Sequence, residues 1–216
     1  MYKVDFHTHS VASPDGGIKP EEYVLALENG TLDYIAITDH NTVKLALELH
    51  DSLGEHIIVG EEIASTQGEI VGLYLVEPIR SGMNALATAR AITAQGGLVY
   101  IPHPLETVRK GVTRETLDVL AKEIDIVEIH NGRAVVQNRG PQAATWARMS
   151  GKAMAASSDA HGARGLGSTY TMLPEPPNVK TLVTSLAQAH YVLNRPSLRS
   201  LLYPKYHRAR KKMGRQ

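Results

Sequence analysis

The sequence predicts a single α/β domain over residues 1–195, folded as a small or distorted barrel of parallel strands with crossover helices. Apolar strand-like runs, polar tips and helical segments alternate about seven times, which favours a parallel sheet. The length agrees with a single domain that is a small or distorted barrel. A chain of 216 residues suffices for one sizeable domain but is short for a barrel of eight strand–helix units.

The first half of the chain begins with a strand at residues 2–7, in which Val4 and Phe6 face away from Asp5 and His7. A helix starts at Pro20, whose missing N–H costs nothing there, and it ends at Asn29-Gly30. On similar grounds we expect a strand at 32–38, a helix at 42–53, a strand at 56–59 and a strand at 70–76 that pairs through a turn at Gln67-Gly68.

Glycines divide the second half of the chain. Gly96-Gly97 ends a helix at 85–94, and Gly151 ends a helix at 142–149. The remaining expected elements are strands at 98–101, 125–129, 153–157 and 191–193, and helices at 114–122 and 180–189.

Composition excludes several classes of function. Without cysteine the chain has no disulfide, no thiolate ligand and no cysteine nucleophile. A net charge of +1 gives no overall attraction to nucleic acid or to acidic membranes. The N-terminus opens directly into a strand, and no apolar run approaches the roughly 18 residues of a membrane-spanning helix. We therefore expect a cytoplasmic protein with no membrane partner.

Residues 196–216 form a tail of different composition. Its basic residues are Lys205, Arg208, Arg210, Lys211, Lys212 and Arg215. One interpretation is a solvated terminus that aids solubility, which we favour. The other is a frayed helix that binds acidic partners, including nucleic acid.

Side chains that can bind a metal stand at nearly every expected strand end. They are His7, His9, His40, Glu62, His103, Glu128, Asp159 and His161. Because the carboxyl ends of parallel strands gather at one face, these side chains should lie close together. Single members have structural alternatives, such as a helix cap for His40 or Asp159 and a rigid turn for His103. The pattern as a whole predicts a metal site.

Six ordered motifs resemble those of the PHP family, the polymerase and histidinol phosphatase superfamily of metal-dependent phosphoesterases. They are DFHTHS (5–10), TDHNT (38–42), GEEI (60–63), IPHP (101–104), VEIHNGR (127–133) and SDAH (158–161). The resemblance covers about residues 1 to 170. It implies a distorted (β/α)7 barrel with two or three divalent ions at the C-terminal ends of the strands. Mixed histidine and carboxylate ligands suit zinc, manganese or iron.

The resemblance also implies a ligand set for each ion. The sets are His7, His9, Glu62 and Asp159 for the first ion, bridging Glu62 with His103 and Glu128 for the second, and Asp15, His40 and His161 for the third. Relatives carry histidine at some of these positions. His130 therefore remains an alternative to Glu128, and the third ion, with Asp15 in place of histidine, is less certain to bind.

The implied function is hydrolysis of a phosphoester in a small phosphorylated metabolite, a nucleotide or an oligonucleotide end by a metal-activated water. Asp159 or His161 is the candidate for proton transfer to the leaving oxygen. Arg133 and Arg164 are candidates for binding phosphate, whose geometry the guanidinium fork matches. Between Glu62 and His103 only a hairpin and one helix fit, so we expect an open pocket bordered by the loops 106–114 and 133–140.

Two alternatives stay open. One is an amidohydrolase-like enzyme that cleaves C–N bonds on a related barrel, although the expected strand ends carry no lysine of the kind that class often uses. The other is a non-catalytic PHP module that binds nucleic acid, although all of its expected ligand positions are filled here. The sequence does not predict an oligomeric state.

Overall fold

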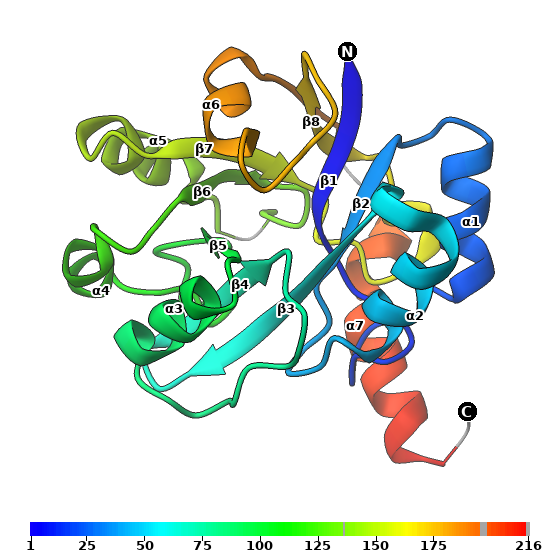
Figure 1. Cartoon of the computed structure of the whole chain (residues 1–216). Helices are drawn as coiled ribbons and strands as arrows, with labels where there is room; N and C mark the ends of the chain where they lie inside the picture. Colours follow the sequence, from blue (N-terminus) through cyan, green and yellow to red (C-terminus); the bar gives the residue numbers. More distant parts are fainter. Residues whose placement is uncertain (136, 195–197, 215–216) are drawn as a thin grey trace.

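The computed structural model describes residues 1–135, 137–194 and 198–214 (Figure 1). Residues 196, 197, 215 and 216 of the basic tail lie outside the described residues, as do 136 and 195. Within the described part, nine strands form one sheet in the order β7-β6-β5-β4-β3-β2-β1-β8-β9. The strands are β1 (Tyr2–Thr8), β2 (Tyr34–Ile37), β3 (Ile57–Ser65), β4 (Gly68–Leu73), β5 (Leu98–Ile101), β6 (Ile126–Asn131), β7 (Ala153–Ser157), β8 (Thr169–Leu173) and β9 (His190–Leu193).

Helices and short 3-10 turns connect these strands. They are α1 (Pro20–Glu28), α2 (Lys44–Leu53), η1 (Gly54–His56), α3 (Ala85–Ala94), α4 (Arg114–Leu120), α5 (Gly140–Met149), η2 (Ala163–Gly165), α6 (Leu182–Ser185), η3 (Leu186–Gln188) and α7 (Leu198–Lys212). Local capping fixes several of their starts. The Asn84 side chain accepts a hydrogen bond from Ala87 N at α3, and Thr113 accepts one from Thr116 N at α4. None of the described helices is long and apolar enough to cross a membrane.

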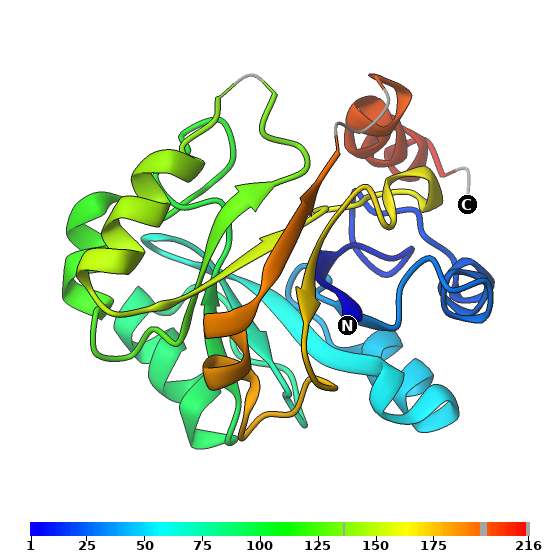
Figure 2. The ribbon, with the colours of Figure 1, turned by 90° about the horizontal axis from the view of Figure 1, so that it is seen from above.

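The sheet is parallel except at one inserted strand and at one end. Strands β1, β2 and β3 are parallel to one another, as are β5, β6 and β7, and β4 runs antiparallel between the two sets. The sheet curls until β7 meets β1, where Thr8 bridges Ala160 and His9 N donates to Ala160 O at 2.8 Å (Figure 2). The expected barrel-like α/β fold is confirmed.

Two details differ from the sequence prediction. Strand β3 continues past Val59 to Ser65 because the β4 hairpin pairs with it, so Glu62 lies inside a strand rather than after one. Strand β8 was not expected, and with β9 it adds two antiparallel strands beside β1. The repeat is therefore not seven regular strand–helix units.

Two apolar clusters hold the layers together. One packs the helices on the sheet and includes Tyr23, Ile92 and Trp146. The other gathers Phe6 and Tyr100, among others, from the opposite strand faces. Each large buried side chain of this kind contributes about 1.5–3 kcal/mol of transfer free energy. In Figure 1, α6 lies near the N-terminal ends of the strands, while α7 lies beside their C-terminal ends.

Candidate metal centre

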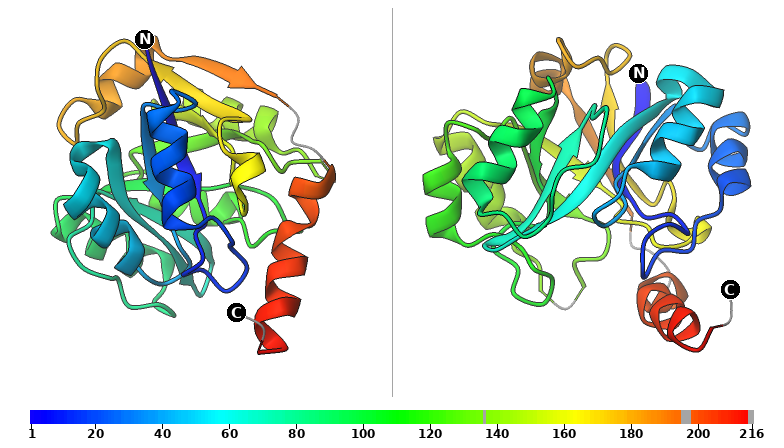
Figure 3. Two further views of the ribbon diagram at one scale, coloured as in Figure 1. Left: turned by 90° about the vertical axis from the view of Figure 1, so that its right-hand side faces the viewer. Right: turned by 60° about the horizontal axis from the view of Figure 1, so that its bottom comes forward.

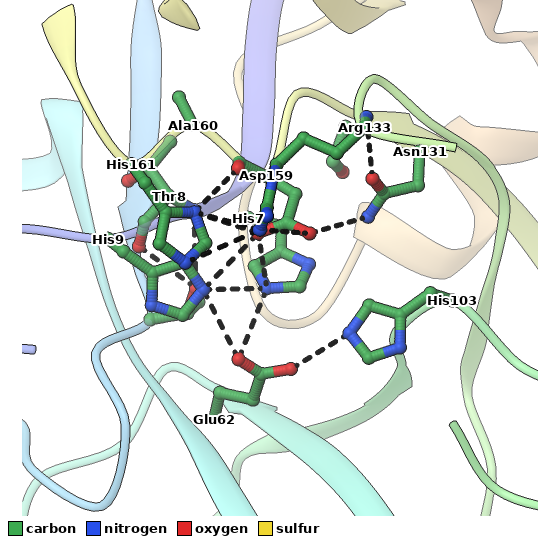
Figure 4. A network of polar contacts seen from close by, with 12 residues as sticks. His7, Thr8, His9, Glu62, His103, Asn131, Arg133, Asp159, Ala160 and His161 are labelled. Carbon is green, nitrogen blue, oxygen red and sulfur yellow. Dashed lines mark hydrogen bonds and ion pairs between the residues drawn. The ribbon is translucent and has the colours of Figure 1, made fainter. Parts of the chain in front are cut away.

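Two histidines from the end of β1 point their Nε2 atoms at one centre (Figure 4). His7 Nε2 and His9 Nε2 lie 3.1 Å apart, and both side chains are buried. The pairing of β1 with β2 shifts register between Asp5 and Thr8, and a shift of this kind changes the direction of side chains at a strand end. Asp5 does not join the centre, because its Oδ1 accepts from Ser158 N at 3.0 Å. Burial raises the pKa of Asp5 to about 7.

The carboxylate of Glu62 lies between the other donors. Its Oε2 is 3.2 Å from His9 Nε2, 3.2 Å from His40 Nδ1 and 3.5 Å from His7 Nε2. Its Oε1 is 3.1 Å from His103 Nε2 (Figure 4). One carboxylate thus faces imidazoles on both sides, which is the arrangement that a bridging ligand needs.

A second group of donors lies on the other side of His9. Asp15, from the turn after β1, brings its Oδ1 within 3.5 Å of His40 Nε2 and 3.6 Å of His161 Nε2. These three residues and His9 offer one ligand atom each, all within 4.8 Å of one another. Three further groups meet the same distance, namely His7, Glu62 and His103; His7, His9 and Asp159; and His40, Glu62 and Glu69.

Glu128 is buried beside the centre but makes its contacts as a hydrogen-bond acceptor. Oε1 lies 3.3 Å from His7 Nδ1 and accepts from Tyr100 Oη at 2.9 Å. Oε2 accepts from His103 N at 2.6 Å and from Asn131 Nδ2 at 2.9 Å. Glu128 belongs to none of the four groups of ligand atoms among the described residues. A His7 with its proton on Nδ1 would donate to this carboxylate and present Nε2 to a cation, and the role of Glu128 as a direct ligand stays a prediction.

Asp159 and the residues around it form the third wall. Its Oδ1 lies 3.7 Å from His7 Nε2 and 3.5 Å from His9 Nε2. Its Oδ2 accepts from Arg109 Nη1 at 2.9 Å and lies 3.5 Å from Arg133 Nη1. One oxygen therefore faces the histidines while the other is held by guanidinium groups.

The backbone is strained where these side chains are presented. Asp159, His103 and Asn41 have φ values of 52°, 30° and 55°, in the left-handed region that residues other than glycine rarely adopt. Each of these residues directly follows a strand end or lies close to one. Such strain concentrates at sites where the surrounding structure fixes a functional geometry.

The electrostatics of the centre favour a cation among the imidazoles. Burial alone lowers the pKa of His9, but hydrogen bonds to Asp159 and Glu62 raise that pKa to about 9. Burial likewise opposes a charge on His7, yet Asp159 and Glu62 hold its pKa well above the ordinary value. Burial, His9 and Arg133 lower the pKa of His161 to about 4, so His161 is a neutral imidazole that can offer a lone pair.

The donor set therefore fits a cluster of divalent ions. If both His7 and His9 carry their protons on Nδ1, two nitrogen lone pairs face each other at 3.1 Å, an arrangement that a proton or a metal ion between them would stabilise. Asp15 Oδ1 and His103 Nδ1 are buried and have no hydrogen-bond partner. Histidine with carboxylate is the ligand chemistry of zinc, manganese and iron.

The centre opens into a cavity of about 460 Å³. Among the charged residues that line it are Arg109, Lys110 and Arg133, from the two loops expected to border the pocket. Arg164 is exposed on η2 and does not line this cavity. His130 lines a separate cavity of about 280 Å³, away from the ligand atoms, so the structure does not bring it to the centre.

Some residues of the site were missed by the sequence prediction. They are Ser13, Glu69, Arg109, Asn131 and Arg208. For Glu69 a signal existed, because the tight turn at residues 66–67 sets the hairpin register and pairs Glu69 with Ala64, on the same strand face as Glu62. Ser13, Arg109 and Arg208 come from loops and the tail, where spacing along the chain does not indicate position, whereas Asn131 is the last residue of β6.

Fold and donor set together define a barrel protein with a candidate multi-ion centre at its strand ends. A family model described as PHP-associated matches residues 139–190. An uncharacterised protein of Methanocaldococcus jannaschii is 30% identical, over 63% of this chain and 87% of that protein. The chain belongs to the PHP superfamily.

Solved structures agree on the fold. A two-domain protein of Bacteroides vulgatus that contains a predicted PHP-like metal-dependent phosphoesterase matches with a TM-score of 0.70 at 20% identity, over 96% of this chain and 69% of that one. An amidohydrolase of Chromobacterium violaceum, solved with bound sulfate and no metal, matches with a TM-score of 0.60 at 16% identity, over 93% of this chain and 96% of that one.

Proposed function

We propose that the protein hydrolyses phosphoesters of small phosphorylated molecules with two or three divalent ions at the strand ends. The observation that carries this proposal is the position of Glu62, whose two oxygens lie within 3.1–3.5 Å of nitrogens of four imidazoles. A carboxylate shared in this way suits ions held about 3.5–4 Å apart, the spacing of two-metal phosphoester hydrolases.

The residues that would hold the ions are those grouped by the structure. They are His7, His9, Asp15, His40, Glu62, Glu69, His103, Asp159 and His161. Bound divalent ions neutralise charge on the phosphate oxygens and lower the pKa of water. The protein contributes the positions of the ligands, through Glu128 on His7 and through the Asp159 carbonyl, which accepts from His161 Nδ1 at 2.9 Å.

Two guanidinium groups beside the centre are suited to bind the phosphate. Arg109 is held by Glu106 Oε2 at 2.6 Å and by Asp159 at 2.9 Å, so little rotamer entropy remains to be lost on binding. Arg133 keeps a more open position, with a side chain 20% exposed, and its Nη1 lies 3.2 Å from His161 Nδ1. Arginine matches the tetrahedral oxygens of phosphate with paired N–H donors.

Proton transfer to the leaving oxygen falls to Asp159 or His161 in this proposal. Burial opposes a charge on Asp159, but Arg133 and His7 hold its pKa well below the usual range, so it stays an acceptor. The low pKa of His161, about 4, likewise favours the neutral form. Both groups are therefore unprotonated at neutral pH, so each would have to accept a proton before it could donate one to the leaving oxygen, and His161 could accept one at Nε2 only while that atom holds no ion.

Phosphoesters are favoured over amides by the residues around the cavity. The lysines that line it, within the described residues, are Lys110 in a loop and Lys205 on α7, and neither stands at a barrel strand end. The guanidinium groups at the centre indicate an anionic substrate instead. A cavity of about 460 Å³ suits a small phosphorylated metabolite or a single nucleotide.

The test is the double variant His7→Ala, His9→Ala, assayed on p-nitrophenyl phosphate and on a panel of phosphorylated metabolites, with an amide panel beside it. We expect hydrolysis of the phosphoesters by the wild type with Mn²⁺, Zn²⁺ or Fe²⁺, and loss of at least 100-fold in the variant with an unchanged circular dichroism spectrum. Phosphoester hydrolysis that survives in the variant, or wild-type activity on amides alone, would refute the proposal. His50→Ala, on the helix α2 outside the centre, is the control.

A further inference from the structure

The basic helix α7 packs against the turn that carries Asp15. Figure 3 shows α7 lying alongside the residues that follow β1. Lys211 Nζ donates to the backbone carbonyl oxygens of Val11 at 2.7 Å and of Gly16 at 3.1 Å, and also to that of Ser13. This lysine alone therefore holds the turn by hydrogen bonds to three backbone carbonyl groups.

Glycines in the facing loops make this close packing possible. A Cβ atom on Gly17 would lie 2.2 Å from the ring of His207, and one on Gly162 would lie 2.8 Å from the ring of Tyr203. At either position a Cβ atom would require the ring on α7 to move. The helix thus fits a surface formed by the turn after β1 and by the segment that follows the SDAH motif.

Arg208 reaches from α7 to one oxygen of a proposed ligand. Its Nη2 donates to Asp15 Oδ2 at 2.7 Å. The other oxygen, Oδ1, is buried, has no hydrogen-bond partner, and lies 3.5 Å from His40 Nε2 and 3.6 Å from His161 Nε2. A carboxylate with one oxygen held by a guanidinium and the other facing two imidazoles is oriented as a metal ligand supported from behind.

We infer that α7 is part of the metal centre and that Arg208 is a positioning residue for the ion held by His9, Asp15, His40 and His161. The ion pair would stabilise little if both partners were exposed, but the Asp15 side chain is only 5% exposed while that of Arg208 is 58% exposed. The arginine therefore acts chiefly by fixing the rotation of the Asp15 carboxylate. Helix α7 is in this respect not a free terminus, because Arg208 and Lys211 both contact the turn after β1.

Arg208 could instead occupy the place of a cation. In that case removing the arginine would raise the number of ions bound, rather than lower it. The inference rests on the metal centre of the proposed function, but ion content is measured without any substrate. If ion content depends on Arg208 but the protein hydrolyses no phosphoester, the proposed function is overturned and this inference still stands.

The experiment compares four full-length proteins with the wild type after chelation and reloading with Mn²⁺. They are Arg208→Ala, Arg208→Lys, Arg210→Ala and Asp15→Asn. Arg210 is the matched control, because it is an exposed arginine of the same helix for which the structure gives no polar contact with the turn. Ions per chain are counted by mass spectrometry after gel filtration, and the affinity of the weakest site is measured by electron paramagnetic resonance.

We expect Arg208→Ala and Asp15→Asn to weaken the same single site by 10-fold or more and to lose that ion on gel filtration. Arg210→Ala should keep the wild-type content, and Arg208→Lys should recover most of it. Equal or higher ion content in Arg208→Ala would overturn the inference. Equal ion losses in Arg208→Ala and Arg210→Ala would also overturn it, because they would indicate a general charge effect. Melting curves of the metal-free proteins separate a local effect from unfolding, because every variant is expected to be fully folded at the temperature of the ion measurement. An Arg208→Ala protein that is partly unfolded at that temperature would also overturn the inference, because the ion loss would then follow from instability.

Discussion

Replacing Glu128 with glutamine tests whether this side chain acts by orienting His7. The carboxylate of Glu128 can only accept, so a metal-bound His7 would keep its proton on Nδ1 and bind through the lone pair of Nε2. The glutamine amide must place its NH₂ toward either His103 N, which is a donor, or toward His7 and Tyr100. The second orientation is preferred, because Tyr100 can turn its proton to Ser157 Oγ at 2.8 Å and accept instead. His7 Nδ1 then becomes an acceptor, and its proton moves to Nε2.

The expected magnitude follows from this change of tautomer. Loss of a carboxylate that orients a metal-binding histidine lowers metal affinity by about 10–100-fold. At about 1.4 kcal/mol for each factor of ten, this amounts to about 1.4–2.8 kcal/mol. The fold should survive, since the glutamine has nearly the same volume and keeps its hydrogen bond from His103 N.

The assay is a competition titration of Zn²⁺ between the metal-free protein and a chromophoric chelator. Glu61→Gln is the control, because Glu61 is as buried as Glu128 but its Oε2 accepts a hydrogen bond from Ile79 N, outside the metal centre. Affinity within twofold of wild type for Glu128→Gln would refute the orienting role. Complete loss of one ion with the others unchanged would refute it as well, and would favour Glu128 as a direct ligand, as the family resemblance implies.

Three further predictions concern stability, substrate binding and packing. Burial raises the pKa of Glu61 from 4.5 to about 7, so its contribution to stability is full below pH 4.5 and is lost as pH rises through 7. The difference in unfolding free energy between Glu61→Gln and wild type should therefore rise by about 2 kcal/mol, in favour of the variant, as the pH increases from about 5 to 8. Urea titration of the metal-free proteins measures this difference, and a difference that does not change with pH would contradict the prediction. Arg133→Ala should lower kcat/KM for phosphoesters by about 10–100-fold through one lost charged hydrogen bond, while exposed Arg114→Ala should change it less than twofold; equal effects would refute the assignment. Gly17→Ala should clash with His207 and increase trypsin cleavage within α7, and an unchanged digestion pattern would show that the helix tolerates the methyl group.

Much of the fold was predictable because strand ends and helix caps are local signals. The histidines that follow β1 and β5 and the SDAH segment after β7 stand at apolar runs that end in polar residues, and parallel strands bring such ends together. Glu62 was predicted at the correct end of the barrel, but as a residue that follows a strand. It lies within β3, and it reaches the centre because the β4 hairpin extends that strand without a change of side-chain alternation.

The remaining parts depend on contacts that no local pattern encodes. Arg109 reaches Asp159 across 50 positions of sequence, and Arg208 reaches Asp15 across 193. Strand β8 pairs with β1 although its sequence, TYTML, offers only five residues of alternation. A short strand and a long-range ion pair are both fixed by tertiary structure, so sequence reasoning found neither.

The seam where β7 meets β1 determines when the site can exist. His9 N bonds to Ala160 O there, so donors encoded at the very start of the chain meet Asp159 and His161 only after most of the polypeptide has been made. A nascent chain that has not yet reached this point lacks two of the four groups of ligand atoms, those that contain Asp159 or His161. The full set of ion sites therefore forms only after the seam closes, and breaking the seam during unfolding would separate the donors of these two groups.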